Sequence, residues 1–368
     1  MISVFEPYLG EEEGQAVLEA IQRGEISGSF GSAITDFEQR FAAYVGAEHG
    51  VACNSGTSAL HLAAAAARLG PGDEVLVSAC TNIATALACL HEGAVAVAVD
   101  SEPDTWNLDL DLLEGLITER TKAIMPVHIY GHPVDMDALN EIAARHDLLV
   151  IEDCAESHGA TVRERMTGSL GDMGCFSFYA NKIITTGEGG MVTTNDADLA
   201  ERSRLLRNLA FTQPRFRHEE AGFNFRMAGY QAAMGLAQLD RIEWVVEEKR
   251  RVAHTYNRLL QDVEWIQTPT ERDWARNVYW MYAAVLSPDA PVSRDDLMAR
   301  LRDDGVDSRT FFCPMNLQPV LQRQEGHRVV DCPVAEGLWE RGLYLPSAIQ
   351  LDEPTIQTVV ERLLRAAA

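Results

Sequence analysis

The sequence predicts an α/β fold with a large domain built on a mostly parallel sheet and a smaller α+β domain. Three observations support this prediction. The 368 residues exceed what one hydrophobic core usually serves. Between residues 50 and 195, short apolar runs rich in β-branched residues alternate with helical patterns, which is typical of a parallel sheet covered on both faces. Near residue 245 the pattern changes, so we expect domains over residues 1–245 and 246–368.

The first domain contains a series of short apolar runs that we interpret as strands. They span residues 75–79, 95–99, 123–127, 148–152, 174–178 and 190–193. Helical patterns lie between them. One of these covers residues 58–69 and stops at Gly70-Pro71, as helices commonly do. This alternation indicates a doubly wound sheet.

The junction between the domains is predicted to be one long amphipathic helix over residues 231–251. Its apolar residues recur at helical spacing, and they are Met234, Leu236, Leu239, Ile242 and Val246. Beyond it we expect a strand at 278–286, a helix at 293–303 and a closing helix at 353–367.

The charge balance restricts the partners. The chain has 31 Lys and Arg against 55 Asp and Glu, a net charge of -24, so it lacks the basic face that nucleic-acid binding requires. Any polyanionic ligand must be held by local cations. The N-terminus MISVFEPYLG does not resemble a signal peptide, and no stretch reaches the ~20 apolar residues that span a bilayer. We therefore expect no nucleic-acid or membrane partner and a cytoplasmic location.

The seven cysteines are odd in number, scattered, and contain no C-x-x-C pair. This spacing argues against a disulfide framework and against a zinc site. We expect buried thiols and no metal.

The first chemically informative stretch is residues 54–61, where small hydroxyl residues and Gly56 lead into a helix. The free N–H groups of a first helical turn attract phosphate, glycine allows close approach, and Thr57 and Ser58 add donors. An ordinary helix N-cap is the alternative interpretation.

The second stretch ends a buried strand with Asp153, Glu156 and His158. Ligands of open α/β sheets bind at the carboxyl ends of the strands. A carboxylate there could pair with a pyridinium nitrogen and keep it protonated, as pyridoxal phosphate requires. A metal site built from the same three residues is the competing hypothesis.

The third stretch places Lys182 after a strand and before the glycine-rich residues 187–190. A lysine that forms an imine must be partly neutral, and low access to water lowers its pKa toward that state. A solvated surface lysine is the alternative. The glycines are not a dinucleotide fingerprint, because they precede a strand rather than a helix.

In this order the three stretches resemble the DegT/DnrJ/EryC1/StrS family of pyridoxal-phosphate sugar aminotransferases. The resemblance runs over nearly the whole chain and includes residues 222–227 (Gly-Phe-Asn-Phe-Arg-Met) and 231–233 (Gln-Ala-Ala). It implies the aspartate-aminotransferase fold, also called fold type I, and a homodimer whose active sites are shared between subunits.

The resemblance also implies roles for individual residues. Lys182 would form the internal aldimine with pyridoxal 5'-phosphate and move the proton of transamination, with pyridoxamine phosphate as the intermediate form. Asp153 would pair with the pyridine nitrogen, and Asn224 would reach the neighbouring subunit's cofactor phosphate. The remaining cofactor-binding residues implied are Gly56, Thr57, Ser58, Asn82, Glu156 and Ser177.

Three further segments, 100–106, 126–133 and 277–282, are similar to the GDP-perosamine synthase branch of the family. That similarity implies L-glutamate as donor and GDP-4-keto-6-deoxymannose as acceptor. Arg226 and Arg309 are candidates to grip the substrate's phosphates, since a guanidinium binds phosphate through two hydrogen bonds. Two departures bear on the substrate. Asn82 stands where the family usually carries an aromatic ring that stacks on the cofactor, and Asn316 replaces the usual histidine near the sugar.

Other functions remain open at this point. A keto sugar linked to dTDP or UDP, a 3-keto sugar or a keto-cyclitol could be the acceptor. A sugar dehydratase of the same fold is a different class, which Lys182 disfavours because a histidine replaces the lysine there. A protein that only holds the cofactor is the third hypothesis.

Overall fold

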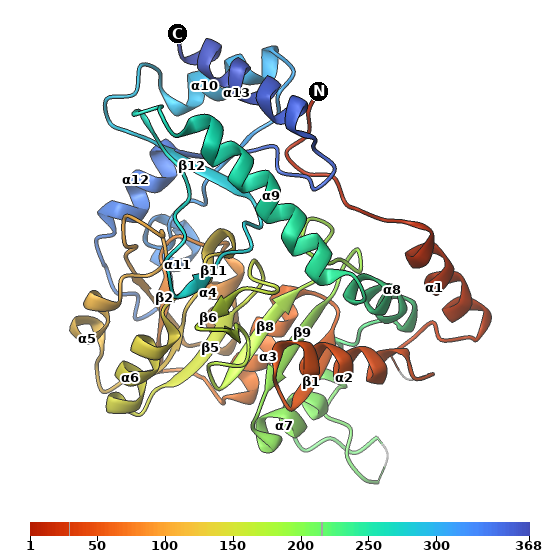
Figure 1. Ribbon diagram of the computed structural model, residues 1–368. Coiled ribbons are helices and arrows are strands. Elements are labelled where there is room, and N and C mark those ends of the chain that lie inside the picture. The colour runs from red at the N-terminus through yellow and green to blue at the C-terminus, as the bar shows by residue number, and fades with distance from the viewer. Residues whose placement is uncertain (29, 215) are drawn as a thin grey trace.

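A seven-stranded sheet lies at the centre of the larger part of the molecule (Figure 1). The computed structural model describes residues 1–28, 30–214 and 216–368. The strand order is β1-β9-β8-β5-β4-β2-β3. Their bounds are β1 (His49–Cys53), β2 (Glu74–Ser78), β3 (Val95–Val99), β4 (Thr121–Met125), β5 (Leu149–Asp153), β8 (Met173–Ser177) and β9 (Gly190–Thr194).

The sheet is mostly parallel, which confirms the predicted fold class. Strands β3, β2, β4, β5 and β8 run parallel, and β9 pairs antiparallel with both β8 and β1, so β9 is the reversed strand of this sheet. Every residue of β2, β3, β8 and β9 is buried, as is typical of strands covered on both faces, and β3 is apolar throughout. The six predicted strands match the observed ones within two residues. Strand β1 was not predicted, although it is equally buried after its first residue.

Helices cover both faces of this sheet. Val75 and Val77 of β2 point to one face and pack with helices α3 (Gly56–Ala66) and α4 (Ala84–Glu92). Leu76, between them, points to the other face and packs with α6 (Met136–His146). Successive side chains of a strand alternate between faces, so neighbouring apolar residues serve two different layers.

The smaller part contains a four-stranded antiparallel sheet with the order β10-β12-β14-β13. The strands are β10 (Ile266–Gln267), β12 (Tyr282–Leu286), β13 (Arg309–Thr310) and β14 (Gly342–Leu345). Helices α9 (Ile242–Leu260), α10 (Arg294–Asp303) and α13 (Glu353–Ala367) pack on it around a second core. Both termini lie at this end of the molecule (Figure 1).

The predicted single helix over 231–251 is wrong. The structure has α8 (Gly229–Leu239), a break at Asp240 and Arg241, and then α9. Arg241 leaves the helical conformation, and its guanidinium pairs with buried Glu13 of α1 (Glu11–Gln22). The apolar spacing continues across the break because Leu239 and Ile242 both enter the same core. Periodicity alone therefore does not reveal it.

The predicted strand 278–286 begins only at Tyr282. Residues 277–281 instead cross from the small sheet toward the large one, and the Val278 N–H donates to the carbonyl of Gly131 at 3.1 Å. Tyr279 adopts a positive φ of 46°, which a strand does not accommodate. This departure brings Trp280 to the site described below.

The remaining elements surround the two sheets or form short connections. The helices are α2 (Ala33–Val45), α5 (Leu113–Leu116), α7 (Ala197–Arg207), α11 (Pro319–Gln322) and α12 (Pro333–Arg341). The short strands are β6 (Thr161–Val162), β7 (Arg165–Met166) and β11 (Ala275–Arg276), which form a third sheet. No helix within the described ranges is both long enough and apolar enough to cross a membrane.

Helix α9 runs between the two parts (Figure 1). Val245 and Val246 belong to the core around the large sheet, whereas Val252, Ala253 and Tyr256 belong to the second core. We propose on this basis that the domain boundary lies near residue 245.

Candidate active site

A cavity of about 340 Å³ opens where strands of the large sheet end. Asn82 follows β2, Asp153 ends β5 and Ser177 ends β8, so this is the carboxyl edge at which open α/β sheets bind ligands. The cavity brings together most of the predicted catalytic and cofactor residues. They are Gly56, Thr57, Asn82, Asp153, Glu156, Ser177 and Lys182.

The N-terminus of α3 forms one wall. The Ser55 hydroxyl caps this helix by accepting the Ser58 N–H at 3.1 Å, and it donates to the Ser58 hydroxyl at 3.0 Å. A Cβ added to Gly56 would lie 2.5 Å from the Ser177 Cβ, so only glycine lets the helix end meet strand β8. The first N–H groups of a helix have no partner inside it, so Gly56 and Thr57 offer donors to an anion.

Asp153 lies in the floor of the cavity and is 4% exposed. Its Oδ2 accepts from the Thr85 hydroxyl at 2.8 Å, and its Oδ1 accepts from the Ala155 N–H at 3.1 Å. Burial raises the pKa of this carboxyl, and the two hydrogen bonds and the charge of Lys182 act in the opposite direction. A protonated pyridine nitrogen would therefore meet a carboxylate whose hydrogen bonds come only from neutral donors.

Lys182 lies in the loop after β8, where its backbone N–H donates to the Tyr179 carbonyl at 3.0 Å. Burial lowers the pKa of its amine, and the carboxylates of Glu156 and Asp153 partly offset this. The Nζ lies 3.7 Å from the centre of the Trp280 ring. The site thus contains a half-buried amine beside two buried carboxylates, which fits a lysine that must be partly neutral to react with an aldehyde.

Glu156 is buried on the same side of the cavity. Its Oε2 accepts from the Tyr130 N–H at 2.7 Å. Burial raises its pKa to about 7, while the charge of Lys182 and this hydrogen bond lower it. Its protonation state therefore changes near neutral pH.

Five predicted residues do not line the cavity of this chain, and they are Ser58, Asn224, Arg226, Arg309 and Asn316. Asn224 is exposed and pairs with Asn208 in an isolated bridge, and the Arg226 guanidinium donates to the Asn208 side chain at 2.7 Å. Arg309 is exposed and pairs with Asp307. Ser58 is bonded through its N–H and its hydroxyl to the cap residue Ser55.

The side-chain amide of Asn316 donates to Glu336 at 2.7 Å. Its Oδ1 is buried and has no hydrogen-bond partner among the residues that the structure describes. Arg309 is nevertheless close to the cavity, because it is the cross-strand neighbour of Tyr344, which lines it.

Sequence reasoning missed the aromatic wall. Tyr179, Trp280, Phe312 and Tyr344 line the cavity. Trp280 lies in segment 277–282, which the family resemblance singles out, and Phe312 lies four residues before Asn316, but no local pattern assigns them to a site. Thr85 was missed for the same reason, since its contact with Asp153 spans 68 positions of sequence.

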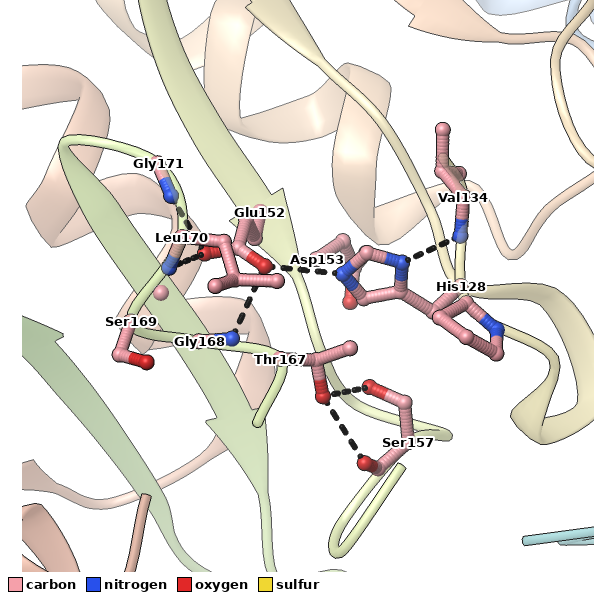
Figure 2. Close-up of polar contacts among 12 residues, drawn as sticks. His128, Val134, Glu152, Asp153, Ser157, Thr167, Gly168, Ser169, Leu170 and Gly171 are labelled. Carbon is pink, nitrogen blue, oxygen red and sulfur yellow. Dashed lines mark hydrogen bonds and ion pairs between the residues drawn. The ribbon is translucent and has the colours of Figure 1, made fainter. Parts of the chain in front are cut away.

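A buried network supports the loop behind Asp153 (Figure 2). The Oε1 of Glu152 accepts the N–H groups of Leu170 and Gly171, each at 2.8 Å, and its Oε2 accepts the N–H of Gly168 at 2.9 Å. His128 Nδ1 accepts a backbone N–H from Val134, so its proton lies on Nε2, which donates to Glu152 at 3.1 Å.

The structure does not favour the alternative metal site. Among the described residues, the group whose ligand atoms come together is His128, Glu152 and Cys154, rather than Asp153, Glu156 and His158. The oxygens of Glu152 and the Nδ1 of His128 are already used by the hydrogen bonds above. Burial lowers the pKa of His158 to about 3, so its ring is neutral among Phe41 and other aromatic rings.

The fold and this cavity define an aminotransferase of the aspartate-aminotransferase type. The family model described as "DegT/DnrJ/EryC1/StrS aminotransferase family" matches residues 7–364. The chain therefore belongs to this family, and it is a pyridoxal-phosphate-dependent enzyme.

Individual relatives cover almost the full chain. A protein of Caulobacter vibrioides named GDP-perosamine synthase is 46% identical over 98% of this chain and 97% of its own. A protein of Acidithiobacillus ferrooxidans, named as a 3-aminotransferase of UDP-N-acetyl-3-dehydro-α-D-glucosamine, is 38% identical over 92% and 90%. The solved structure of DesV from S. venezuelae, in complex with a ketimine intermediate, has a TM-score of 0.90 at 35% identity and covers 97% and 94%.

Proposed function

We propose that the enzyme transfers an amino group from L-glutamate to a nucleotide-linked keto sugar, and that GDP-4-keto-6-deoxymannose is the acceptor, giving GDP-perosamine. The observation that carries the chemistry is the meeting of Lys182, the Asp153 carboxylate and the α3 N-terminus in one cavity. The similarity to GDP-perosamine synthase supports the choice of acceptor.

The residues of the cavity fit pyridoxal phosphate at three separate points. Lys182 is the amine for the aldehyde, Asp153 is the carboxylate for the pyridine nitrogen, and the first turn of α3 with Ser177 supplies phosphate donors. When bound, the cofactor withdraws electrons from the carbon that bears the amino group. We assign Gly56, Thr57 and Ser58 to its phosphate, since the first turn of α3 comprises these residues.

The remaining roles in the reaction are assigned to side chains of the protein. Lys182, once free, accepts and donates the proton, because burial lowers the pKa of its amine and so favours the neutral form that can accept a proton. Asp153 keeps the pyridine nitrogen protonated. Glu156, held by the Tyr130 N–H, lies beside Lys182 and sets the charge of that side of the cavity. The aromatic wall excludes water and offers flat apolar surfaces to a sugar ring.

We propose that the enzyme is a homodimer with shared active sites. Segments 25–28 and 226–229 lie against each other, since a Cβ on Gly28 would meet Arg226 at 2.8 Å. Large apolar side chains are exposed on and near these segments, among them Ile26 at 58% and Phe30 at 67%. Exposed apolar surface of this kind marks interfaces, and Asn224 is exposed beside it. An Asn224 turned toward solvent fits a residue that reaches a neighbour's cofactor.

The substrate's phosphates require local cations in a chain of net charge -24. We assign this role to Arg309, which lies across from Tyr344 at the cavity, and to Arg226 on the proposed dimer face. Asn316 is assigned to binding of the acceptor sugar only because it replaces the histidine that the family usually carries there. All seven cysteines are free, six of them buried, which supports a reducing compartment such as the cytoplasm.

The test is mass spectrometry of products after purified protein, pyridoxal phosphate and L-glutamate are incubated with GDP-, dTDP- and UDP-linked 4-keto-6-deoxy sugars. Amination of the GDP sugar is the expected result, and Lys182→Ala should abolish it. Amination of another sugar would overturn the acceptor but keep the enzyme class. Loss of the mass of water from a sugar would identify a dehydratase, and no reaction would direct the search to 3-keto sugars and keto-cyclitols.

A further inference from the structure

Lys249 is a buried cation whose position the function described so far does not explain. It lies on α9, is 3% exposed, and its Nζ donates to the carbonyls of Trp280 at 2.9 Å and Ser347 at 2.7 Å. No carboxylate within the described part of the chain forms an ion pair with it. Burial lowers its pKa to about 7. Burying an ammonium without a counter-ion costs free energy. We therefore expect the two carbonyls that Lys249 binds to be held in place for a functional reason.

Trp280 is held from two sides. Lys249 binds its carbonyl, and its indole N–H donates to the carbonyl of Asn181 at 2.6 Å. The ring is 4% exposed and stacks on Tyr130, with an interplanar angle of 14° and centroids 6.2 Å apart. Since residues 277–281 are outside the small sheet, these side-chain contacts, rather than strand pairing, determine where the ring lies.

The face of this ring is directed at the reacting atom of the site. The Lys182 Nζ lies 3.7 Å from the ring centroid, within the range of a cation–π interaction. Asn181, which anchors the indole N–H, is the residue immediately before Lys182. The ring and the lysine loop are therefore fixed to each other.

We propose that Trp280 is a catalytic residue that binds the free ammonium of Lys182 on its ring face, and that Lys249 is a positioning residue that fixes Trp280. The proposal rests on the assigned role of Lys182. In a transamination the lysine is released from the cofactor and must stay near it to move the proton. An aromatic face holds an ammonium without a hydrogen bond, so the amine is retained but stays free to turn.

Several titratable groups face Lys182 in addition to the ring. The charges of Asp153 and Glu156 act on it, and its own charge acts on His158. Beneath it a small cavity of about 20 Å³ is lined by Glu6, Tyr8 and Lys249 among others. The first test therefore compares variants of Trp280 that leave all of these groups in place.

The first test uses cofactor-free protein and follows the rate of covalent adduct formation with pyridoxal phosphate as a function of pH. The midpoint of this profile reports the pKa of the Lys182 amine, and borohydride reduction with peptide mapping confirms the site. Trp280→Leu should lower the midpoint by about one pH unit, because the ammonium loses its aromatic partner. Trp280→Phe, which keeps a ring, should lower it less.

The matched control is Trp274→Leu, which changes the same residue type where Trp274 packs on His132 and Arg163. It should leave the midpoint unchanged. An unchanged or higher midpoint in Trp280→Leu would overturn the proposal, since the ring would then act only as a barrier to water.

The second test is a double-mutant cycle with Lys249→Met. This variant should lower the midpoint in the same direction, with no further shift when it is combined with Trp280→Leu. Additive shifts would show that Lys249 does not act through Trp280. Circular dichroism and urea unfolding check the fold, and if Lys249→Met does not fold, the Leu and Phe variants of Trp280 still decide the main point.

These outcomes are independent of the acceptor. A shifted midpoint with no product from any keto sugar would retain the role of Trp280 and reject the proposed substrate. No adduct at Lys182 in the native protein would reject the assigned function itself, and the proposal for Trp280 with it.

Discussion

The Thr85 hydroxyl on helix α4 donates a 2.8 Å hydrogen bond to the Asp153 carboxylate at the end of β5. Both groups are buried, Thr85 at 0% and Asp153 at 4% exposure. The bond occupies Oδ2, and the Ala155 N–H occupies one position on Oδ1. The carboxylate is thus fixed in orientation before any ligand binds, which favours recognition of a single atom such as a pyridine nitrogen.

Replacing Thr85 by valine keeps the shape of the side chain and removes this bond. Hydrogen bonds to charged groups contribute about 1.5–3 kcal/mol, so we expect affinity for pyridoxal phosphate to fall about 10- to 100-fold. Absorbance titration of cofactor-free protein measures it. Thr358→Val on α13 removes a hydroxyl bonded to the Pro354 carbonyl and should have no effect. Equal affinities in both variants would contradict the role of Thr85.

Glu156 should make the stability of cofactor-free protein depend on pH. Its pKa in the folded state, about 7, exceeds the ordinary value of 4.5. The folded state therefore binds the proton more tightly, and this contribution to stability is present below the ordinary pKa and lost as pH rises through about 7. The free energy of unfolding of Glu156→Gln, relative to that of wild type, should therefore increase by about 1–3 kcal/mol as the pH rises from about 5 to about 8.

Urea unfolding across this pH range measures the difference. Exposed Glu264 provides the matched control, because Glu264→Gln changes the same group in water and should give a difference that does not vary with pH. A constant difference for Glu156→Gln as well would show that its carboxyl is not raised in pKa by burial.

Much of the fold could be predicted because the strands of the large sheet are buried on both faces. Such strands are rich in apolar residues, and 95–99, which is apolar throughout, was placed without error. The break at Arg241 could not be predicted, because it depends on a contact with Glu13 that lies 228 positions away. The crossing segment 277–281 consists mostly of residues that favour strands, and long-range contacts such as that with Gly131 hold it outside the small sheet.

The site shows the same division. Gly56, Asp153 and Lys182 each occur in a local pattern with its own chemistry, at a helix start or a strand end. Trp280 reaches the cavity through the irregular segment, and Thr85 acts on Asp153 through a hydrogen bond that spans 68 positions of sequence. Arg226 and Asn224 lie away from the cavity in a single chain, which is where residues that serve a neighbouring subunit would be found.

Gly56→Ala should disturb the end of α3. The added Cβ would lie 2.5 Å from the Ser177 Cβ, so the helix start or β8 must shift. We expect a loss of about 1–3 kcal/mol of stability and at least about a tenfold weaker binding of pyridoxal phosphate. Gly14→Ala in α1, where a Cβ meets nothing within 4 Å, should instead increase the stability of the protein by up to about 1 kcal/mol. Similar behaviour of the two variants would exclude a tight contact at Gly56.

Asn82 occupies an exposed position at the cavity, and its Oδ1 accepts the Ala84 N–H at 3.0 Å. Asn82→Phe should restore an aromatic surface for the cofactor ring. Aromatic pairs contribute about 0.5–1.5 kcal/mol, so cofactor affinity should rise about 2- to 10-fold in an absorbance titration. Asn82→Ala separates this gain from loss of the hydrogen bond. If phenylalanine and alanine give the same affinity, the ring of the cofactor does not lie over this position.

Substitution of Glu152 should lower the stability of the protein strongly, although this residue lies behind the cavity. Its two oxygens accept three backbone N–H groups and the N–H of the His128 ring (Figure 2). Glu152→Gln replaces one oxygen by an amide that turns its hydrogens toward N–H donors. Because the site is fully buried, the unsatisfied donors should cost about 2–4 kcal/mol.

Urea unfolding of cofactor-free protein tests this, with the exposed Glu48→Gln as the matched control. The control should change stability by less than about 0.5 kcal/mol. The loop that Glu152 holds, residues 168–171, lies directly before β8, whose end carries Ser177. Cofactor affinity should therefore fall together with stability in Glu152→Gln. Lost stability with unchanged affinity would show that the network supports the fold without reaching the site.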